Sequence, residues 1–245
     1  MTYLVNFDRF ELLKFLPKKG KVAEIGVKRG KYAHKIFNIN KPEKLHLIDP
    51  WGIDEDDSYM IVARENSLDM QSYYERVLET FSSQIDSGEV QIHRNYSCHA
   101  VTSFPDLYFD WVYVDANHLY GPVLNDLISL GPKVKEDGFI VGHDFVNSAK
   151  TSKEGYGVTE AVYSFLKLNP DFSLVLLTNE VHGSFVISKH PGGENEAYFL
   201  NKVFASANYL IKTGDLFSLN YKQIELDFYD PETNEKAIKT IIQLG

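Results

Sequence analysis

Short apolar runs separated by longer amphipathic segments are the feature that most constrains how this chain folds. The runs have the length of β-strands and lie at 21–26, 45–49, 90–93, 111–115, 139–143, 174–177 and 184–188. Because segments with helical periodicity lie between most of them, successive strands are expected to run parallel, with helices covering both faces of the sheet. The pattern therefore predicts a doubly wound α/β fold with a mostly parallel sheet.

The runs also suggest how the chain is divided. We expect one main domain over residues 1–190 and a helical C-terminal extension over 191–245, in which 194–212 has the pattern of an amphipathic helix. This extension is expected to complete a substrate pocket, to form the interface of a homo-oligomer, or simply to pack against the core. A leading helix is predicted at 7–16, ended by Pro17.

A polar, acidic insertion at 52–69 interrupts the alternation directly after the second apolar run. A segment of this kind next to a strand end can close over a ligand as a lid. It can equally be a solvated surface loop or helix with no role in chemistry. The sequence leaves both readings open.

Composition narrows the classes of function. The chain has 245 residues, 44% of them hydrophobic, which is ample for a packed core. Its 25 basic and 34 acidic residues give a net charge of −9, which disfavours binding to nucleic acid. Cys98 is the one cysteine, so an intrachain disulfide and a cysteine-based zinc site are excluded. We expect no membrane association and a cytoplasmic location, because no apolar run approaches the roughly 20 residues of a membrane helix.

Two glycines follow the first apolar run in the pattern Glu24-x-Gly26-x-x-x-Gly30. Glycines at a strand-to-helix turn let a ligand approach the backbone closely, and the pattern favours a cofactor site. The spacing differs from that of dinucleotide-binding turns and from that of a phosphate loop. A turn whose glycines serve the backbone alone is the alternative.

This predicted cofactor site is extended by three residues that lie at or after the ends of the second and third apolar runs. Asp49 ends the second run and is suited to accept two hydrogen bonds from a ribose diol. Trp51 can lie against an adenine ring, or else belong to the core or anchor a lid. Ser97, after the third run, can bond the adenine edge, cap the next helix, or do both.

Polar residues also end the fourth and fifth runs. Asp115 terminates 111–115, and His118 follows three residues later, while His143 and Asp144 stand at the end of 139–143. Because parallel strands end at one edge of the sheet, these four side chains are expected to gather there. A helix cap for Asp115 and a turn position for Asp144 are the alternatives that need no function.

Together the motifs resemble those of class I S-adenosylmethionine-dependent methyltransferases, and within them the metal-dependent group that includes the macrolide-sugar O-methyltransferases. The resemblance covers about residues 21–189 and is carried by Glu24-x-Gly26-x-x-x-Gly30, Ile48-Asp-Pro-Trp51, Val114-Asp-Ala-Asn-His-Leu-Tyr120 and Gly138-x-x-x-Gly-His-Asp144. The family commonly has a Gly-Asp pair where this chain has Ala116 and Asn117, so the turn before His118 is altered.

This resemblance implies a Rossmann-like, seven-stranded sheet with an antiparallel last strand. It places the methionine part of S-adenosylmethionine over residues 24–30 and the ribose on Asp49. It also implies a divalent cation, usually Mg²⁺, bound by Asp115 and Asp144, with His118 as the general base. His143 stands where relatives can present another ligand, although magnesium prefers oxygen donors. The reading requires the carboxyl groups of Asp115 and Asp144 to lie within about 10 Å of each other.

The chemistry explains why these residue types would occur together. A sulfonium methyl is already activated, so the protein has mainly to align a nucleophile and manage one proton. An alcohol is a poor nucleophile until its proton leaves, and a cation on adjacent oxygens lowers that cost while a histidine accepts the proton. We therefore expect metal-assisted O-methylation of a small hydroxylated molecule, such as a sugar or glycoside with paired hydroxyls.

Other functions fit some of the same residues. A methyltransferase acting on nitrogen or a carboxylate would need no metal, and a protein that binds S-adenosylmethionine without methyl transfer can use the same fold. A nicotinamide-dependent oxidoreductase is disfavoured by the glycine spacing. Loss of activity on chelation separates the first of these from the metal-assisted reaction.

Overall fold

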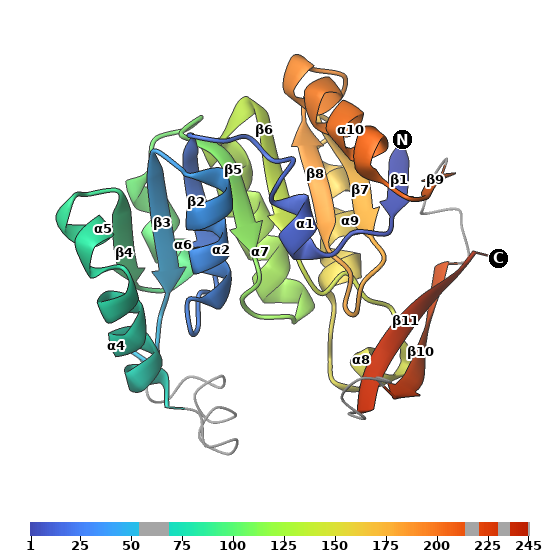
Figure 1. The fold of residues 1–245 in the computed structure, drawn as a ribbon, viewed down its shortest axis with the longest axis horizontal. Coiled ribbons are helices and arrows are strands. Elements are labelled where there is room, and N and C mark those ends of the chain that lie inside the picture. Colours follow the sequence, from blue (N-terminus) through green and yellow to red (C-terminus); the bar gives the residue numbers. More distant parts are fainter. Residues whose placement is uncertain (54–68, 214–220, 230–235, 245) are drawn as a thin grey trace.

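A nine-stranded sheet forms the centre of the protein (Figure 1). The computed structural model describes residues 1–53, 69–213, 221–229 and 236–244. The polar insertion predicted at 52–69 lies for the most part outside these residues. Among the described residues, no helix is long and apolar enough to pass through a lipid bilayer.

Most strands of the large sheet are parallel. The sheet contains β1 (Thr2–Val5), β2 (Lys21–Ile25), β3 (Lys44–Asp49), β4 (Val90–Arg94), β5 (Phe109–Val114), β6 (Val134–Gly142), β7 (Phe172–Thr178), β8 (Phe185–Lys189) and β9 (Leu210–Thr213). Their order is β4-β3-β2-β5-β6-β8-β7-β1-β9, and β8 and β9 run against the other seven. A separate two-stranded sheet pairs β10 (Tyr221–Tyr229) with β11 (Lys236–Leu244).

Helices cover both faces of the sheet. They are α1 (Arg9–Leu12), α2 (Lys31–Asn40), α4 (Met70–Thr80), α5 (Ser82–Asp86), α6 (Ser97–Ala100), α7 (Tyr120–Leu130), α8 (Ala149–Lys153), α9 (Val158–Leu168) and α10 (Glu194–Ser206), with short 3₁₀ turns η1 (Val101–Ser103) and η2 (Gly131–Lys133). One core cluster includes residues of α1, α2, α4 and α10, and the other includes residues of α6, α7 and α9.

Alternation along the strands builds the two cores. In β5, Trp111 and Tyr113 belong to one cluster, and Val112 and Val114 belong to the other. All four side chains are buried, as expected for a strand in the middle of a sheet that is covered on both sides. The predicted doubly wound α/β class is confirmed.

The strand count differs from the seven implied by the family resemblance, because β1 and β9 extend the sheet beyond β7. β1 pairs parallel with β7, and β9 pairs antiparallel with β1. β1 lies before the first apolar run that we recognised, in a segment of only four residues, which is too short to show a period. The antiparallel strand expected at the end of the seven is β8, and it is present.

Both chain ends carry less helix than predicted. The leading helix is the short α1, and after it the backbone N–H groups of Lys14 and Phe15 bond to carbonyls three residues back, which is a 3₁₀ pattern. In the C-terminal extension α10 ends at Ser206, and β9 follows because the free edge of β1 offers strand pairing. The domain boundary near residue 190 and a role in oligomers stay predictions.

The carboxyl ends of β2, β3, β4, β5 and β6 lie at one edge of the sheet, since these strands are parallel neighbours. The residues that follow them are the ones that the sequence singled out for chemistry. The N–H of Asp115 donates to the carbonyl of Ile25, and the N–H of His143 donates to the carbonyl of Val114. These bonds tie the ends of β2, β5 and β6 together.

Candidate functional site

The turn after β2 needs glycine for backbone reasons. Gly26 has φ +88°, and a Cβ there would lie 2.1 Å from the carbonyl oxygen of Asp115. Gly30 has φ +72° and is the N-cap residue of α2, and a Cβ there would lie 2.9 Å from a methyl group of Val77. Both positions are left-handed and crowded, so the glycine pair serves close packing whether or not a ligand also approaches.

Glu24 lies beneath this turn with an unpaired oxygen. Its side chain is 1% exposed, and among the described residues its Oε2 atom has no hydrogen-bond partner. Burial raises the pKa of Glu24 well above its ordinary value, and the charges of Asp115 and Asp49 raise it further. A buried acid without a partner, next to a glycine turn, is what a cationic ligand group would complete.

Asp49 holds the glycine turn from the neighbouring strand. One carboxylate oxygen accepts hydrogen bonds from the N–H groups of Val27 and Lys28, at 2.9 and 2.8 Å, and the other accepts from the N–H of Trp51 at 2.7 Å. Burial raises the pKa of Asp49, while these three donors oppose the rise. A carboxylate has about four acceptor sites, so the ribose contact stays a chemically sound prediction.

Trp51 is buried in the core. Its indole N–H donates to the carbonyl of Lys28 at 2.8 Å, and its ring lies 5.2 Å from that of Tyr74 in α4. The side chain has no exposed surface. These contacts favour the core role among the alternatives for Trp51, and a contact with adenine stays a prediction.

Ser97 begins α6, but the N-cap residue of that helix is Tyr96. The hydroxyl of Ser97 donates to Asp126 of α7 at 2.5 Å instead of capping the helix. Burial raises the pKa of Asp126 to about 6, although the bond from Ser97 lowers it in part. Asp126 therefore fixes the loop after β4, where the adenine edge is expected.

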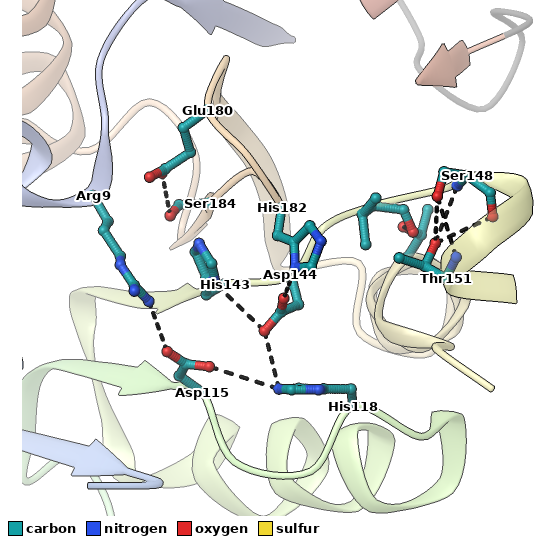
Figure 2. A network of polar contacts seen from close by, with 12 residues as sticks. Arg9, Asp115, His118, His143, Asp144, Ser148, Thr151, Glu180, His182 and Ser184 are labelled. Carbon is teal, nitrogen blue, oxygen red and sulfur yellow. Dashed lines mark hydrogen bonds and ion pairs between the residues drawn. The ribbon is translucent and has the colours of Figure 1, made fainter. Parts of the chain in front are cut away.

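The strongest concentration of polar groups is at the ends of β5 and β6 (Figure 2). Nε2 of His118 lies 3.0 Å from a carboxylate oxygen of Asp144 and 3.8 Å from one of Asp115. One potential ligand atom from each of these three residues lies within 4.8 Å of the other two. The two acids are thus well within the limit of about 10 Å beyond which they could not share a cation.

Two further histidines surround Asp144. Nδ1 of His182, from the turn between β7 and β8, lies 2.9 Å from one carboxylate oxygen, and Nδ1 of His143 lies 3.3 Å from the other. The backbone N–H of Asp144 donates to the carbonyl of His182, and Asp144 has φ +58°, a strained conformation for a residue with a side chain. Three imidazoles therefore hold one carboxylate.

Arg9, in α1 near the N-terminus, contacts the same group of side chains. Its Nη1 atom donates to Asp115 at 2.9 Å and contacts the hydroxyl of Tyr113 at 3.4 Å. Figure 2 shows Arg9 and His118 reaching Asp115 from different sides. We call Arg9, Asp115, His118, His143, Asp144 and His182 the edge cluster.

Charges within the edge cluster shift its titrations. Burial by itself would lower the pKa of His118, but hydrogen bonds and negative charge from Asp115 and Asp144 raise it to about 9. Burial would raise the pKa of Asp144, yet the bonds from its three imidazoles hold it well below its usual range. His118 is therefore protonated near neutral pH in this arrangement, and it can accept a proton only once the negative charge of the two carboxylates is offset.

Residues 23–145, just over half of the chain, match the model of a family described as a methyltransferase domain. The chain belongs to this family. It is an S-adenosylmethionine-dependent methyltransferase, as the motifs led us to expect. No curated protein sequence matches the chain.

Solved structures resemble this methyltransferase in fold at low sequence identity. A protein from Corynebacterium glutamicum aligns over 76% of this chain and 83% of its own, with a TM-score of 0.54 and 12% identity. A Clostridium thermocellum protein provisionally assigned as an rRNA methylase aligns over 75% of this chain and 94% of its own, with a TM-score of 0.51 and 12% identity. A Staphylococcus aureus protein provisionally assigned as a caffeoyl-CoA O-methyltransferase aligns over 76% of this chain and 86% of its own, with a TM-score of 0.50 and 16% identity. Acceptors this different share the fold, so the fold leaves the acceptor of this methyltransferase open.

Sequence reasoning missed two members of the edge cluster of this methyltransferase. Arg9 lies 106 positions from Asp115 along the chain, and no local pattern links the two. His182 stands 38 positions after Asp144, and no motif in the sequence links the two. The remaining predicted residues lie at the carboxyl edge, and their roles toward cofactor and metal stay predictions.

Proposed function

We propose that this methyltransferase methylates a hydroxyl of a small molecule, such as a sugar or glycoside, with the help of a divalent cation. The observation that carries the proposal is the convergence of Asp115, His118 and Asp144 within 4.8 Å beside the glycine turn. Two carboxylates and an imidazole at one strand edge are the groups that activation of an alcohol requires. The net charge of −9 supports a small-molecule acceptor over a nucleic acid.

The donor chemistry of the cluster fits a cation such as Mg²⁺. Asp115 and Asp144 would hold it, since oxygen donors at about 2.0–2.1 Å are what magnesium prefers. When bound, the cation lowers the cost of removing a proton from an alcohol and orients neighbouring oxygens. His143 offers nitrogen and already bonds to Asp144, so we assign it to holding that carboxylate rather than to the ion.

The chain's own residues divide the remaining work. Asp144 orients His118 through a 3.0 Å contact, and we assign His118 to accept the proton of the acceptor hydroxyl. The ring of Tyr156 lies 4.7 Å from that of His118 and 5.8 Å from that of His182. Tyr156 therefore bounds the side from which a small acceptor would reach His118.

Cation binding and methyl transfer test the proposal together. Binding of Mn²⁺, followed by titration calorimetry and electron paramagnetic resonance, should show one ion per chain. Release of S-adenosylhomocysteine from a panel of vicinal diols and catechols should stop on complete chelation and return with Mg²⁺ or Mn²⁺. The Asp144→Asn variant should bind Mn²⁺ at least about 10-fold more weakly, because loss of a ligand should exceed the effect of losing an outer partner.

Asp106→Asn is the matched control. Asp106 pairs with Lys133 at 2.7 Å, its side chain is 68% exposed, and it precedes the amino end of β5, whereas Asp115 follows the carboxyl end. The same loss of negative charge should leave Mn²⁺ binding unchanged there. Methyl transfer to a hydroxyl that persists under complete chelation would contradict the role of the metal.

A second function, methyl transfer to nitrogen or a carboxylate without metal, is favoured by one observation. Arg9 and three imidazoles already pair with the two carboxylates of the edge cluster. Such pairing is complete without a cation. Turnover of amine or carboxylate acceptors that is insensitive to chelation would support this function over the first.

A further inference from the structure

Arg9 has hydrogen-bonding capacity that the edge cluster does not use. Its Nη1 atom serves Asp115 and Tyr113, while Nε and Nη2 have no hydrogen bond to any of the described residues. The side chain is 28% exposed, so part of it is accessible to a ligand. A guanidinium with one edge occupied and the other free is suited to a planar anion such as a carboxylate.

The position of Arg9 is fixed by aromatic contacts beside the glycine turn. The guanidinium carbon lies 5.6 Å from the ring centres of both Phe10 and Tyr32. Tyr32 is the second residue of α2, which begins at that turn, and its hydroxyl donates to the carbonyl of Arg9 at 3.2 Å. The ring of Tyr32 also lies 4.1 Å from that of Tyr113 in β5. The contacts place the guanidinium over the ends of β2 and β5.

Glu24 supplies an unpaired carboxyl group at the same edge. Its Oε2 atom is buried without a partner, and Arg9 is close enough to oppose the rise in the pKa of Glu24. A ligand group between the two would meet a cation on one side and an acid on the other. The methionine part of S-adenosylmethionine carries both a carboxylate and an ammonium group.

We propose that the free edge of Arg9 binds the carboxylate of the cofactor's methionine part, while Glu24 faces its ammonium group. The proposal rests on the methyltransferase class of the chain and not on metal binding or on the acceptor. A carboxylate on the acceptor would present the same chemistry to Arg9, so the experiment has to separate the two sources.

Three ligands that differ only in the amino-acid part provide that separation. S-adenosylhomocysteine has the whole part, its decarboxylated form lacks the carboxylate, and 5′-methylthioadenosine lacks both charged groups. We expect the unaltered protein to bind S-adenosylhomocysteine about 10- to 100-fold more tightly than the decarboxylated form, in titration calorimetry without acceptor or metal. Equal affinities would overturn the proposal without any variant.

The Arg9→Gln variant should lose this preference and bind 5′-methylthioadenosine as the unaltered protein does. Arg9→Lys keeps the charge but not the two-pronged geometry, and should retain part of the preference. Lys14→Gln removes a cation from an exposed position five residues after Arg9, and it should leave the affinities for all three ligands unchanged. A preference that survives in Arg9→Gln would overturn the assignment to the cofactor, as would equal weakening of all three ligands, which a merely structural role would produce.

Discussion

Two groups of histidines lie in different parts of the sheet, and His118 of the edge cluster and His46 of the interior group are held in opposite charge states. In the edge cluster, the carboxylates of Asp115 and Asp144 raise the pKa of His118 to about 9. In the interior, His46 of β3 contacts His93 of β4 at 3.0 Å and the hydroxyl of Tyr108 at 3.1 Å. Burial, together with the positive charge of nearby groups, lowers the pKa of His46 to about 3.

Strand position explains the difference. His46 lies inside β3 and is 1% exposed, and its ring packs against those of Phe104 and Phe109. His118 follows the end of β5, where loops bring acids from separate strands to one place. His46, within a covered strand, is thus held neutral, whereas His118, beyond a strand end, is held charged by the acids around it.

The largest expected effect separates the two groups by activity. His118→Gln should lower methyl transfer to the best vicinal-diol or catechol acceptor about 10²- to 10⁴-fold, because the proton acceptor is lost. Affinity for S-adenosylhomocysteine should change little, whereas the midpoint of thermal unfolding should fall, because Asp144 loses a charged partner at 3.0 Å. His93→Gln, in the interior group, is the control and should leave the rate near that of the unaltered protein. A fall in stability with unchanged turnover in His118→Gln would remove the distinction.

The interior group should make the stability of the fold sensitive to acid. Because His46 is neutral when folded and protonates below about pH 6.5 when unfolded, stability should fall as pH drops from 6.5 toward 3, by up to about 1.4 kcal/mol per pH unit. His46→Gln should cost stability at pH 7.5 through weakened hydrogen bonds, yet show a shallower decline. Urea unfolding at pH 7.5, 6 and 4.5 measures the gap, which should narrow in acid. Parallel pH profiles would count against the assignment.

A smaller effect on stability is expected from a comparison of two buried acids, Asp144 and Asp126. Asp144 has three imidazole partners, whereas the hydroxyl of Ser97 is the one side-chain partner of Asp126 among the described residues, and burial raises the pKa of Asp126 to about 6. Since this pKa is raised on folding, the ionised acid costs stability once pH rises through about 4 to 6. Asp126→Asn keeps an acceptor for Ser97 and should stabilise the protein by about 1 to 2 kcal/mol at pH 7, with almost no change at pH 4. Urea unfolding at the two pH values provides the measurement, and a loss of stability at pH 7 would show that the charged form is favoured.

The sequence predicted the parts of the site that follow strand ends. Asp115 and Asp144 were placed at one edge from the apolar runs before them, and the structure brings their carboxyl groups together with His118. The glycine turn and Asp49 were predicted to be neighbours, and Asp49 in fact bonds to the backbone of that turn. Such predictions succeed because parallel strands align their carboxyl ends whatever packs around them.

Predictions failed where a contact depends on distant segments. The pairing of β1 with β7 and of β9 with β1 joins segments that lie far apart along the chain, and the four-residue strands β1 and β9 carry too little periodicity to be recognised. The burial of Trp51 depends on α4, which begins 19 residues later. No short-range pattern records such partners.

The order of apolar and amphipathic segments by itself determined the doubly wound class, the edge that carries chemistry and the residues at its strand ends. The tertiary structure alone decided that Arg9 and His182 join that edge, and that His46 and His118 have opposite charge states. The physical reason is the distance along the chain over which each property is set. Periodicity is set by neighbours within a few residues, whereas the charge of a side chain depends on burial and on partners that only the packed chain brings near.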